Sequence, residues 1–224
     1  MAGLSPEDCQ LQSMPHTSPV KWHLAHTTWF FETLVLELHE PQFQPFDATF
    51  RHLFNSYYLG VGSAHSRSER GLISRPDLAE VLRYRAQVDA RMHLLLSADD
   101  VAHELRGRVE LGLQHEQQHQ ELLQCDLLHA LSRHPARQAL RPAPAPAEPD
   151  PPASPMRWQR LRGGLVWQGW HPALDGAFAF DNETPRHRIW LQPFEIADRL
   201  VSNAEFLRFM AEGGYQQHGG GIGR

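Results

Sequence analysis

The chain has 224 residues and a formal net charge of −5, and this length suffices for one well-formed core or for one domain plus part of another. The negative charge argues against a general nucleic-acid binder and against a protein that binds acidic membranes. No apolar run is long enough to span a membrane, residues 1–18 lack the pattern of a signal peptide, and two cysteines cannot form a disulfide framework, so we expect a cytoplasmic protein.

Two Ser-Pro pairs predict helix starts near the beginning of the chain. The pair at Ser5 predicts a short helix running towards Met14, and the pair at Ser18 opens a longer one over Val20–His39. The apolar residues of the longer segment recur at helical spacing and predict an amphipathic helix. These residues are Trp22, Leu24, Ala25, Trp29, Phe30, Leu34, Val35 and Leu38. His26 lies near its start, where a histidine is more often a hydrogen-bonded core residue than a metal ligand.

Residues 41–75 show no regular pattern and are rich in aromatic and polar side chains. The segment is long for a connector within a compact domain, and long ordered connectors tend to be functional, so we expect it to line a pocket. It includes Arg67 and Arg70, which are three residues apart and could form a clamp for a carboxylate. The plainer interpretation is a solvated basic loop, and the residues alone favour it.

Two further long helices follow. Ser74 is the expected cap of a helix over Pro76–Leu96, and a capping box at Ser97 opens another over roughly Asp99–Ser132, which Gly107 could bend or fray. The expected buried side of the first of these two consists of Leu78, Val81, Leu82, Val88, Met92 and Leu95. Three long amphipathic helices indicate a helical bundle.

Residues 135–156 are rich in proline and alanine and predict an extended, semi-rigid linker. The linker separates a helical domain over residues 1–134 from a second region over residues 157–224. The predicted fold class is therefore α+β.

The second region has the patterns of a few strands and one helix. Arg157–Gln168 and His187–Ala197 predict strands, and Ser202 caps a short helix over Asn203–Glu212. So few elements make a poor independent core, and we interpret the region as the opening part of a domain.

The stretch Leu111–His129 contains no proline and carries His115 and His119 four residues apart. On a helix, residues at this spacing differ by about 40° of rotation and about 6 Å of rise, so both imidazoles can reach one metal ion. The alternative is a solvated polar face, and the histidine pair alone does not decide between the two.

The residues from His115 to His119 read H-E-Q-Q-H and match the H-E-x-x-H motif of zinc proteases. A metzincin would continue with glycine and histidine at positions where this chain has Leu122 and Cys125. No Asp or Glu occurs in residues 127–147 to serve as a third ligand, so the protease interpretation is disfavoured.

The third ligand is therefore expected upstream, and His26 on the neighbouring long helix is the candidate. Three neutral imidazoles leave open coordination positions that suit either zinc with a water or non-haem Fe(II) with O2. Ligand type alone does not separate these two metals.

Five segments of the chain form a specific combination. They are Ser18–Glu32 (SPVKWHLAHTTWFFE), Phe54–Tyr58 (FNSYY), Arg75-Pro76 before the second long helix, His115–Glu121 (HEQQHQE) and Phe180–Arg188 (FDNETPRHR). Together they closely resemble the iron-dependent ergothioneine sulfoxide synthases, also called hercynine oxygenases, and the resemblance extends to about Tyr215. It implies a DinB-like helical domain followed by the opening part of a domain similar to formylglycine-generating (sulfatase-modifying) enzymes, which has a C-type-lectin-like fold.

The resemblance also implies an activity and site residues. The three Fe(II) ligands of the family correspond to His26, His115 and His119. Arg67 and Arg70 match arginines that hold the carboxylates of γ-glutamylcysteine, and Gln118 matches a residue that contacts hercynine. The family joins the cysteine sulfur to C2 of the hercynine imidazole with O2 and forms a sulfoxide, so small molecules are the expected partners.

Departures from the family pattern lower the expected activity. Family members carry another helix before the position of Met1, and most of their second domain, including a tyrosine that acts near the iron, has no counterpart here. The glycine-rich residues 219–224 do not resemble the family continuation. We therefore assign no catalytic residue and expect a truncated or frame-shifted reading frame with little turnover.

Two other functions stay open. A DinB-type thiol transferase would use zinc or another divalent ion to activate a low-molecular-weight thiol, and it would need no second domain. A non-catalytic metal-binding remnant would need only the histidines.

Overall fold

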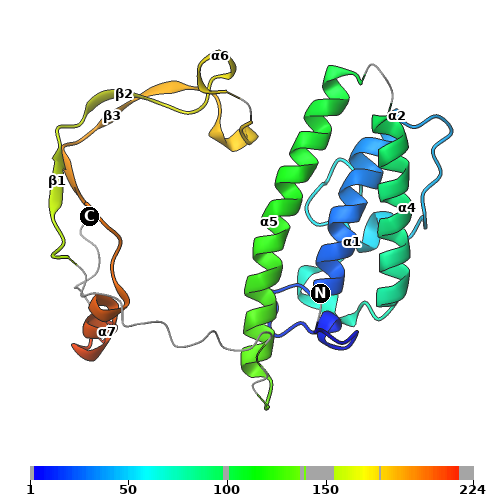
Figure 1. Cartoon of the computed structure of the whole chain (residues 1–224), viewed down its shortest axis with the longest axis horizontal. Helices are drawn as coiled ribbons and strands as arrows, with labels where there is room; N and C mark the ends of the chain where they lie inside the picture. The colour runs from blue at the N-terminus through cyan, green and yellow to red at the C-terminus, as the bar shows by residue number, and fades with distance from the viewer. Residues whose placement is uncertain (1–2, 98–100, 137–138, 140–153, 177, 217–224) are drawn as a thin grey trace. The chain divides into compact units, whose positions relative to one another are not determined.

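The computed structural model describes residues 3–97, 101–136, 139, 154–176 and 178–216. The chain divides into two compact units, Met1–Ala143 and Pro144–Arg224, and each is described by itself. The first unit is helical and the second carries small antiparallel sheets, so the predicted α+β class is confirmed (Figure 1). Most of the predicted linker at 135–156 lies outside the described residues, and the predicted domain boundaries stay predictions. Within the described ranges, no helix is both long and apolar enough to cross a bilayer.

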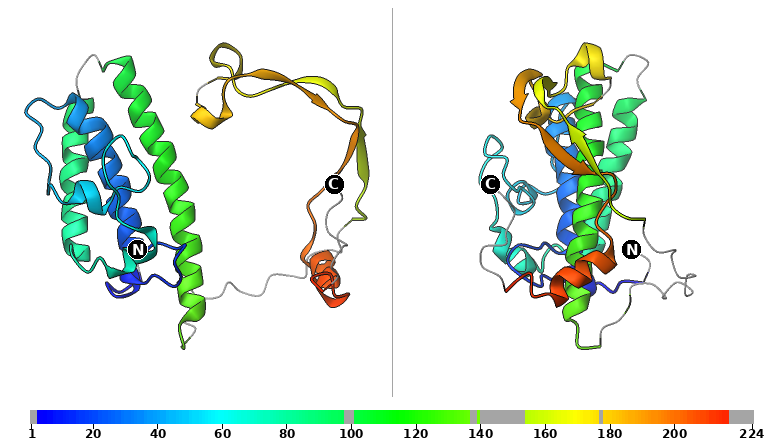
Figure 2. Two further views of the ribbon diagram at one scale, coloured as in Figure 1. Left: turned by 180° about the vertical axis from the view of Figure 1, so that it is seen from behind. Right: turned by 90° about the vertical axis from the view of Figure 1, so that its left-hand side faces the viewer.

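Three long helical segments build the first unit. α1 (Val20–Phe31) continues through a π-helical segment, η2 (Glu32–Leu36), into the short α2 (Glu37–His39). α4 (Leu78–Leu96) and α5 (His103–Arg133) both pack against α1, which lies between them (Figure 1, Figure 2). The predicted bundle is therefore present, and the first of the three predicted long helices lies at its centre.

The central position of α1 explains why it is not amphipathic. Eleven of its twelve residues are buried, including the polar ones, because α4 and α5 cover opposite parts of its surface. Among them, Lys21 is satisfied by the carbonyl oxygens of Ile73 and Pro76, to which its Nζ donates hydrogen bonds of 2.8 Å each. Leu38, predicted on the buried stripe, is 56% exposed because it lies beyond the π-helical segment, which shifts the register.

The predicted short helix near the N-terminus is a single 3-10 turn, η1 (Asp8–Gln10). Ser5 and Asp8 cap it reciprocally, since each side chain accepts a hydrogen bond from the backbone amide of the other, at 3.1 and 2.9 Å. No longer helix forms there because the next described residues leave the helical conformation at Leu11.

The connector between α2 and α4 contains two short helices, α3 (Phe50–Leu53) and η3 (Arg67–Leu72), and is otherwise irregular, as predicted. Asn55 organises it: the fully buried amide donates to the carbonyl oxygens of Tyr58 and Gly62. These bonds fix the loop beside Phe54, whose backbone contacts the candidate site described below.

Two predicted helix starts are wrong. The N-cap of α4 is Asp77, whose carboxylate accepts from the amide of Glu80 at 2.7 Å, and it replaces the predicted cap Ser74. The helix α5 begins at His103 with no side-chain cap, whereas the hydroxyl of Ser97 donates to the carbonyl oxygen of His93 at the end of α4. Residues 98–100 of the predicted capping box lie outside the described residues. The helix α5 runs unbroken through Gly107, so the predicted fraying at that position does not occur.

In the second unit, β1 (Trp158–Leu161) pairs with β4 (Phe194–Ala197), and β2 (Gly164–Gln168) pairs with β3 (His187–Leu191), both antiparallel. Each predicted strand is thus two strands. Gly163 marks the break: its φ is +68°, and a Cβ there would lie 2.3 Å from a backbone oxygen of the opposite strand.

Short helices complete the second unit. They are α6 (Pro172–Asp175), the 3-10 turn η4 (Asp181–Glu183) and α7 (Asn203–Ala211). The predicted cap of α7 is confirmed, because Ser202 and Glu205 form a capping box. None of the described residues of this unit is buried.

Candidate metal centre

Three histidines from two neighbouring helices converge inside the first unit. His26 comes from α1, and His115 and His119 come from α5; one ring nitrogen of each lies within 4.8 Å of the others. His26 is fully buried, His115 is 4% exposed and His119 is partly buried. The helical spacing of the α5 pair and the packing of α1 against α5 together produce this cluster. The structure therefore brings together all three predicted ligands.

The ring of His26 is held on several sides. Its Nδ1 lies 2.6 Å from the carbonyl oxygen of Phe54 and therefore donates to it. The indoles of Trp22 and Trp29 stack against it with centroid distances of 4.5 and 5.5 Å. Its Nε2 is buried and has no hydrogen-bond partner among the described residues. That nitrogen keeps a lone pair directed into the cluster of histidines.

His115 and His119 differ in their surroundings. His115 stacks on Phe30 at 4.6 Å, and both of its ring nitrogens are buried without a partner in the described part of the chain. His119 Nδ1 lies 2.9 Å from Nδ1 of His23, which leaves its Nε2 free of that bond. Buried nitrogens without partners are rare in proteins, and a bound cation would satisfy them. The donor set fits a divalent metal ion.

The electrostatics keep these imidazoles neutral. Burial lowers the pKa of His115 to about 4. Burial, followed by the nearby His115, His23 and arginine charges, lowers the pKa of His119 to about 3. Burial is also the main reason that the pKa of His26 lies well below its usual value. Neutral imidazoles at pH 7 are the form that binds metals.

Arg70 is the predicted substrate residue that the structure buries. Its guanidinium is buried 3.4 Å above the ring centroid of Trp22, and it donates to the hydroxyls of Ser18 and Ser56 at 2.9 and 3.0 Å. In the described chain it has no carboxylate hydrogen-bond partner, and its Nε is unpaired. Burial, and then the charge of Arg67, lower the pKa of Arg70 to about 10. A buried guanidinium of this kind can bind an anion.

The two other predicted substrate residues are exposed. Arg67 lies at the start of η3, and its positive charge contributes to the lowered pKa of His119. Gln118 precedes His119 on α5 and makes no side-chain hydrogen bond within the described ranges. Their substrate roles stay predictions.

Glu116 would be the general base if the H-E-x-x-H motif belonged to a zinc protease. Both of its carboxylate oxygens instead accept hydrogen bonds from Nη2 of Arg85 on α4, at 2.8 and 2.9 Å. The carboxylate is thus engaged in an ion pair between helices. This geometry agrees with the sequence-based argument against a protease.

His23 and Asp126 belong to the same cluster but are not among the predicted site residues. His23 is 3% exposed, and its Nε2 lies 3.1 Å from Oδ2 of Asp126. Helical spacing holds a weak signal for both, because His23 precedes His26 by three residues and Asp126 follows His119 by seven. Each therefore lies on the same face of its helix as a predicted ligand.

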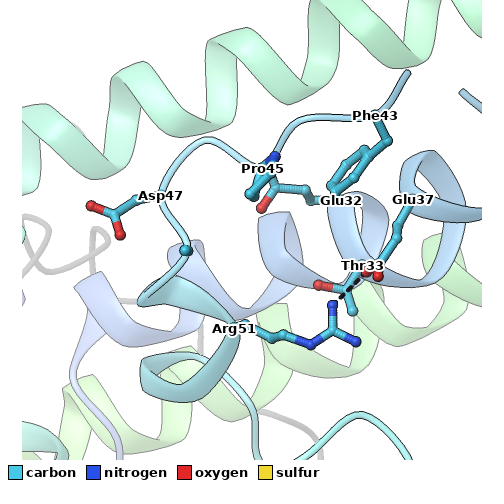
Figure 3. Close-up of a pocket in the computed structure, with 8 residues that line it drawn as sticks. Glu32, Thr33, Glu37, Phe43, Pro45, Asp47 and Arg51 are labelled. Carbon is cyan, nitrogen blue, oxygen red and sulfur yellow. Dashed lines mark hydrogen bonds and ion pairs between the residues drawn. The ribbon is translucent and has the colours of Figure 1, made fainter. Parts of the chain in front are cut away.

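A separate pocket of about 280 Å³ lies beside the π-helical segment (Figure 3). It is lined by Glu32, Thr33, Glu37, Phe43, Pro45, Asp47, Ala48 and Arg51. The prediction that the connector lines a pocket is confirmed, although this pocket includes none of the three histidines. Arg51 in the pocket pairs with Glu37 at 2.6 Å.

Comparison with known proteins gives a family. Residues 1–123 match the model of the DinB superfamily. The chain belongs to the DinB superfamily. All three converging histidines lie within this DinB part.

The second unit is similar to a different family. Residues 147–222 match the sulfatase-modifying factor enzyme 1-like domain. The formylglycine-generating enzyme of Streptomyces coelicolor is 38% identical over 78 residues, which cover 33% of this chain and 24% of that enzyme. The chain thus spans about a quarter of the length of this curated relative. A DinB part followed by a region of this kind is the domain pair that the sequence resemblance implied.

Proposed function

We propose that this DinB chain binds Fe(II) through His26, His115 and His119 and serves the O2-dependent joining of γ-glutamylcysteine or cysteine to hercynine. The observation that carries the proposal is the cluster of three neutral imidazoles whose ring nitrogens lie within 4.8 Å. The pairing of a DinB part with a sulfatase-modifying-factor-like region supports the choice of reaction.

Fe(II) held by three imidazoles supplies open coordination positions and the redox chemistry that O2 requires. The protein's part is to hold the ligands neutral and fixed before the metal arrives. Burial keeps the imidazoles neutral. The Phe54 carbonyl and the two stacked tryptophans hold the ring of His26 in place. Ligands that are already oriented reduce the cost of binding.

Arg70 is the residue we propose for the carboxylate of the thiol substrate, with Arg67 as its partner. A planar guanidinium stacked on Trp22 presents its N–H groups in a fixed plane, which suits a carboxylate. Burial without a carboxylate partner in the described chain makes an incoming anion favourable there. Gln118 is proposed to contact hercynine, on the basis of the resemblance.

The proposed overall reaction balances with O2 as the oxidant. The sulfur forms a bond to C2 of the hercynine imidazole, and the S–H and C2–H hydrogens leave. One oxygen atom forms the sulfoxide, and the other takes both hydrogens and leaves as water. The four electrons that reduce O2 come from the two broken bonds and from oxidation of the sulfur.

The test is an anaerobic incubation of the purified chain with Fe(II), hercynine and γ-glutamylcysteine, followed by O2 and mass spectrometry of the product. A longer homologous protein that contains both kinds of domain runs in parallel, and we expect the sulfoxide from it. Absence of the sulfoxide from this longer protein, with Fe(II) bound, would reject the proposed reaction.

A second candidate is a DinB-type metal-dependent thiol transferase. It is favoured by one observation, namely that all three histidines belong to the DinB part. Oxygen-electrode measurements separate the two functions, because thiol transfer consumes no O2. Small molecules are the proposed partners in both cases, with no role for nucleic acid or a membrane.

A further inference from the structure

A chain of hydrogen bonds leads away from the metal centre. Nδ1 of His119 lies 2.9 Å from Nδ1 of His23, and Nε2 of His23 lies 3.1 Å from Oδ2 of Asp126. The same Oδ2 accepts a hydrogen bond of 2.8 Å from the backbone amide of Ser18. Two ring nitrogens facing each other can share only one hydrogen, so one of the two histidines donates and the other accepts.

The carboxylate of Asp126 determines which of the two donates. Burial raises the pKa of Asp126, but the hydrogen bonds from His23 and from the Ser18 amide lower it more, and the net pKa is below the usual value. An ionised carboxylate only accepts, so Nε2 of His23 donates a hydrogen to it. When the ring of His23 carries this one hydrogen, its Nδ1 has the lone pair. His119 must then carry its hydrogen on Nδ1. Its Nε2 is left with a free lone pair.

We infer that Asp126 and His23 are positioning residues that fix the tautomer and the ring orientation of His119, so that Nε2 is the nitrogen offered to the metal. The inference rests on the proposed metal site, although the tautomer itself exists without metal. The Phe54 carbonyl does the same for His26, because it accepts from Nδ1 and leaves Nε2 free. Outer partners of this kind commonly orient metal-binding histidines.

Four substitutions test the individual links in this series of hydrogen bonds. His23→Phe keeps an aromatic ring but removes both nitrogens, whereas His23→Asn can keep an acceptor near the Nδ1 position. Asp126→Leu removes the acceptor. Asp126→Asn removes only the charge, because the Ser18 amide requires an oxygen at the Oδ2 position and this oxygen also accepts from His23.

The first measurement is the affinity of the full chain for Co(II), by competition with a chelator and by the visible spectrum. We expect a 10- to 100-fold loss, roughly, for His23→Phe and Asp126→Leu, and a smaller loss for His23→Asn and Asp126→Asn. The matched control is His129→Phe on the same helix, which removes a hydrogen bond of 2.7 Å to Ser13 outside the chain of bonds and should leave the affinity unchanged. Thermal unfolding followed by circular dichroism confirms that each variant is folded.

The second measurement reads the tautomer of His119 in metal-free protein, by long-range proton–nitrogen NMR of 15N-histidine-labelled chain. We expect the Nδ1–H form in the native protein and in Asp126→Asn, and a mixture or the Nε2–H form in His23→Phe. An Nε2–H form in the native protein overturns the inference, as does a His23→Phe variant with unchanged tautomer and affinity. The expected tautomer without Co(II) or Fe(II) binding would instead refute the metal site and leave the tautomer assignment standing.

Discussion

His115 is buried against Phe30, and neither of its ring nitrogens has a hydrogen-bond partner in the described chain. A core histidine selected for packing alone would satisfy at least one of them. We therefore predict that His115→Leu stabilises the metal-free protein by about 1–2 kcal/mol, because it removes two unsatisfied polar atoms. The same change should lower metal affinity by at least about 100-fold. Urea unfolding and a metal titration check both parts, and a destabilised variant that still binds metal would contradict them.

The lowered pKa values of the histidines also predict how stability depends on pH. In the unfolded chain these residues titrate near pH 6.5, whereas folded His115 and His119 titrate at about 4 and 3. Below pH 6.5 the unfolded state binds more protons than the folded state. The contribution of the two histidines to the free energy of unfolding is therefore fully present above that pH, and it falls as the pH drops towards the folded-state pKa values. Each group contributes a slope of at most about 1.4 kcal/mol per pH unit. Urea unfolding between pH 7.5 and 5 should show this fall, and His115→Leu should make it shallower.

Arg70 offers a test that separates substrate binding from metal binding. We predict that Arg70→Met weakens binding of γ-glutamylcysteine to the metal-loaded chain by roughly 10- to 100-fold, since a charge-assisted hydrogen-bonded pair is lost. Metal affinity should hardly change. Calorimetry measures both, with Arg51→Met as the control because Arg51 pairs with Glu37 in the separate pocket. Equal thiol binding by the two variants would remove Arg70 from the proposed site.

Individual residues show where a sequence can and cannot predict such a site. The spacing of His115 and His119 predicts a shared face, and His26 follows from the resemblance and the need for a third ligand. For His23 and Asp126 helical spacing gives only a weak signal, because their relation to His119 depends on how α1 packs against α5. Contacts between distant segments cannot be read from periodicity within one helix.

At the scale of helices, the spacing between α1 and α5 determines the geometry of the centre. A Cβ at Gly112 would lie 2.6 Å from Cε1 of Phe31, so the ring of this α1 residue packs directly on α5 one turn before His115. We predict that Gly112→Ala costs about 1–3 kcal/mol by overpacking and weakens metal binding by separating the ligands.

The matched control for this prediction lies on the same helix. A Cβ at Gly107 meets nothing within 4 Å, so Gly107→Ala should stabilise the protein by roughly 0.5–1 kcal/mol through helix propensity alone. Urea unfolding and metal titration of the two variants provide the comparison. Similar effects of the two substitutions would show that close packing at Gly112 is unimportant.

The helices themselves were largely predictable, but their burial was not. The periodicity of Val20–His39 predicts one apolar stripe and one solvated face, which holds only for a helix with a single packed side. Because α1 has partners on both sides, its polar residues are buried as well. On α4 the fully buried Tyr84 is missing from the predicted set, and the predicted Leu82 is 44% exposed, since the packed face is set by the direction of approach of α1.

At the scale of the whole molecule, the three histidines, the hydrogen-bond chain and Arg70 all belong to the first unit, Met1–Ala143. We predict that a fragment of residues 1–143 folds cooperatively and binds metal with an affinity within about threefold of the full chain, because no ligand is removed. Thermal unfolding and a metal titration of the fragment test this. Loss of metal binding in a folded fragment would show that the second unit contributes to the centre.

The second unit was predictable as strands and a helix, but its packing was not. The first predicted strand divides into two at Gly163, where the backbone turns. The second predicted strand divides at the position opposite that glycine. Large apolar side chains such as Trp158, Trp167 and Trp190 are more than half exposed. Alternating patterns in a sequence identify strands, but they do not identify what covers them.

The claim on which the proposed function depends is that residues 26, 115 and 119 bind one cation together. X-ray absorption spectroscopy of the chain loaded anaerobically with Fe(II) tests it most directly. We predict one Fe(II) per chain with three imidazole nitrogens in its coordination shell, and loss of that signature in His26→Ala. A coordination shell without imidazoles, or a spectrum that His26→Ala leaves unchanged, would contradict the claim.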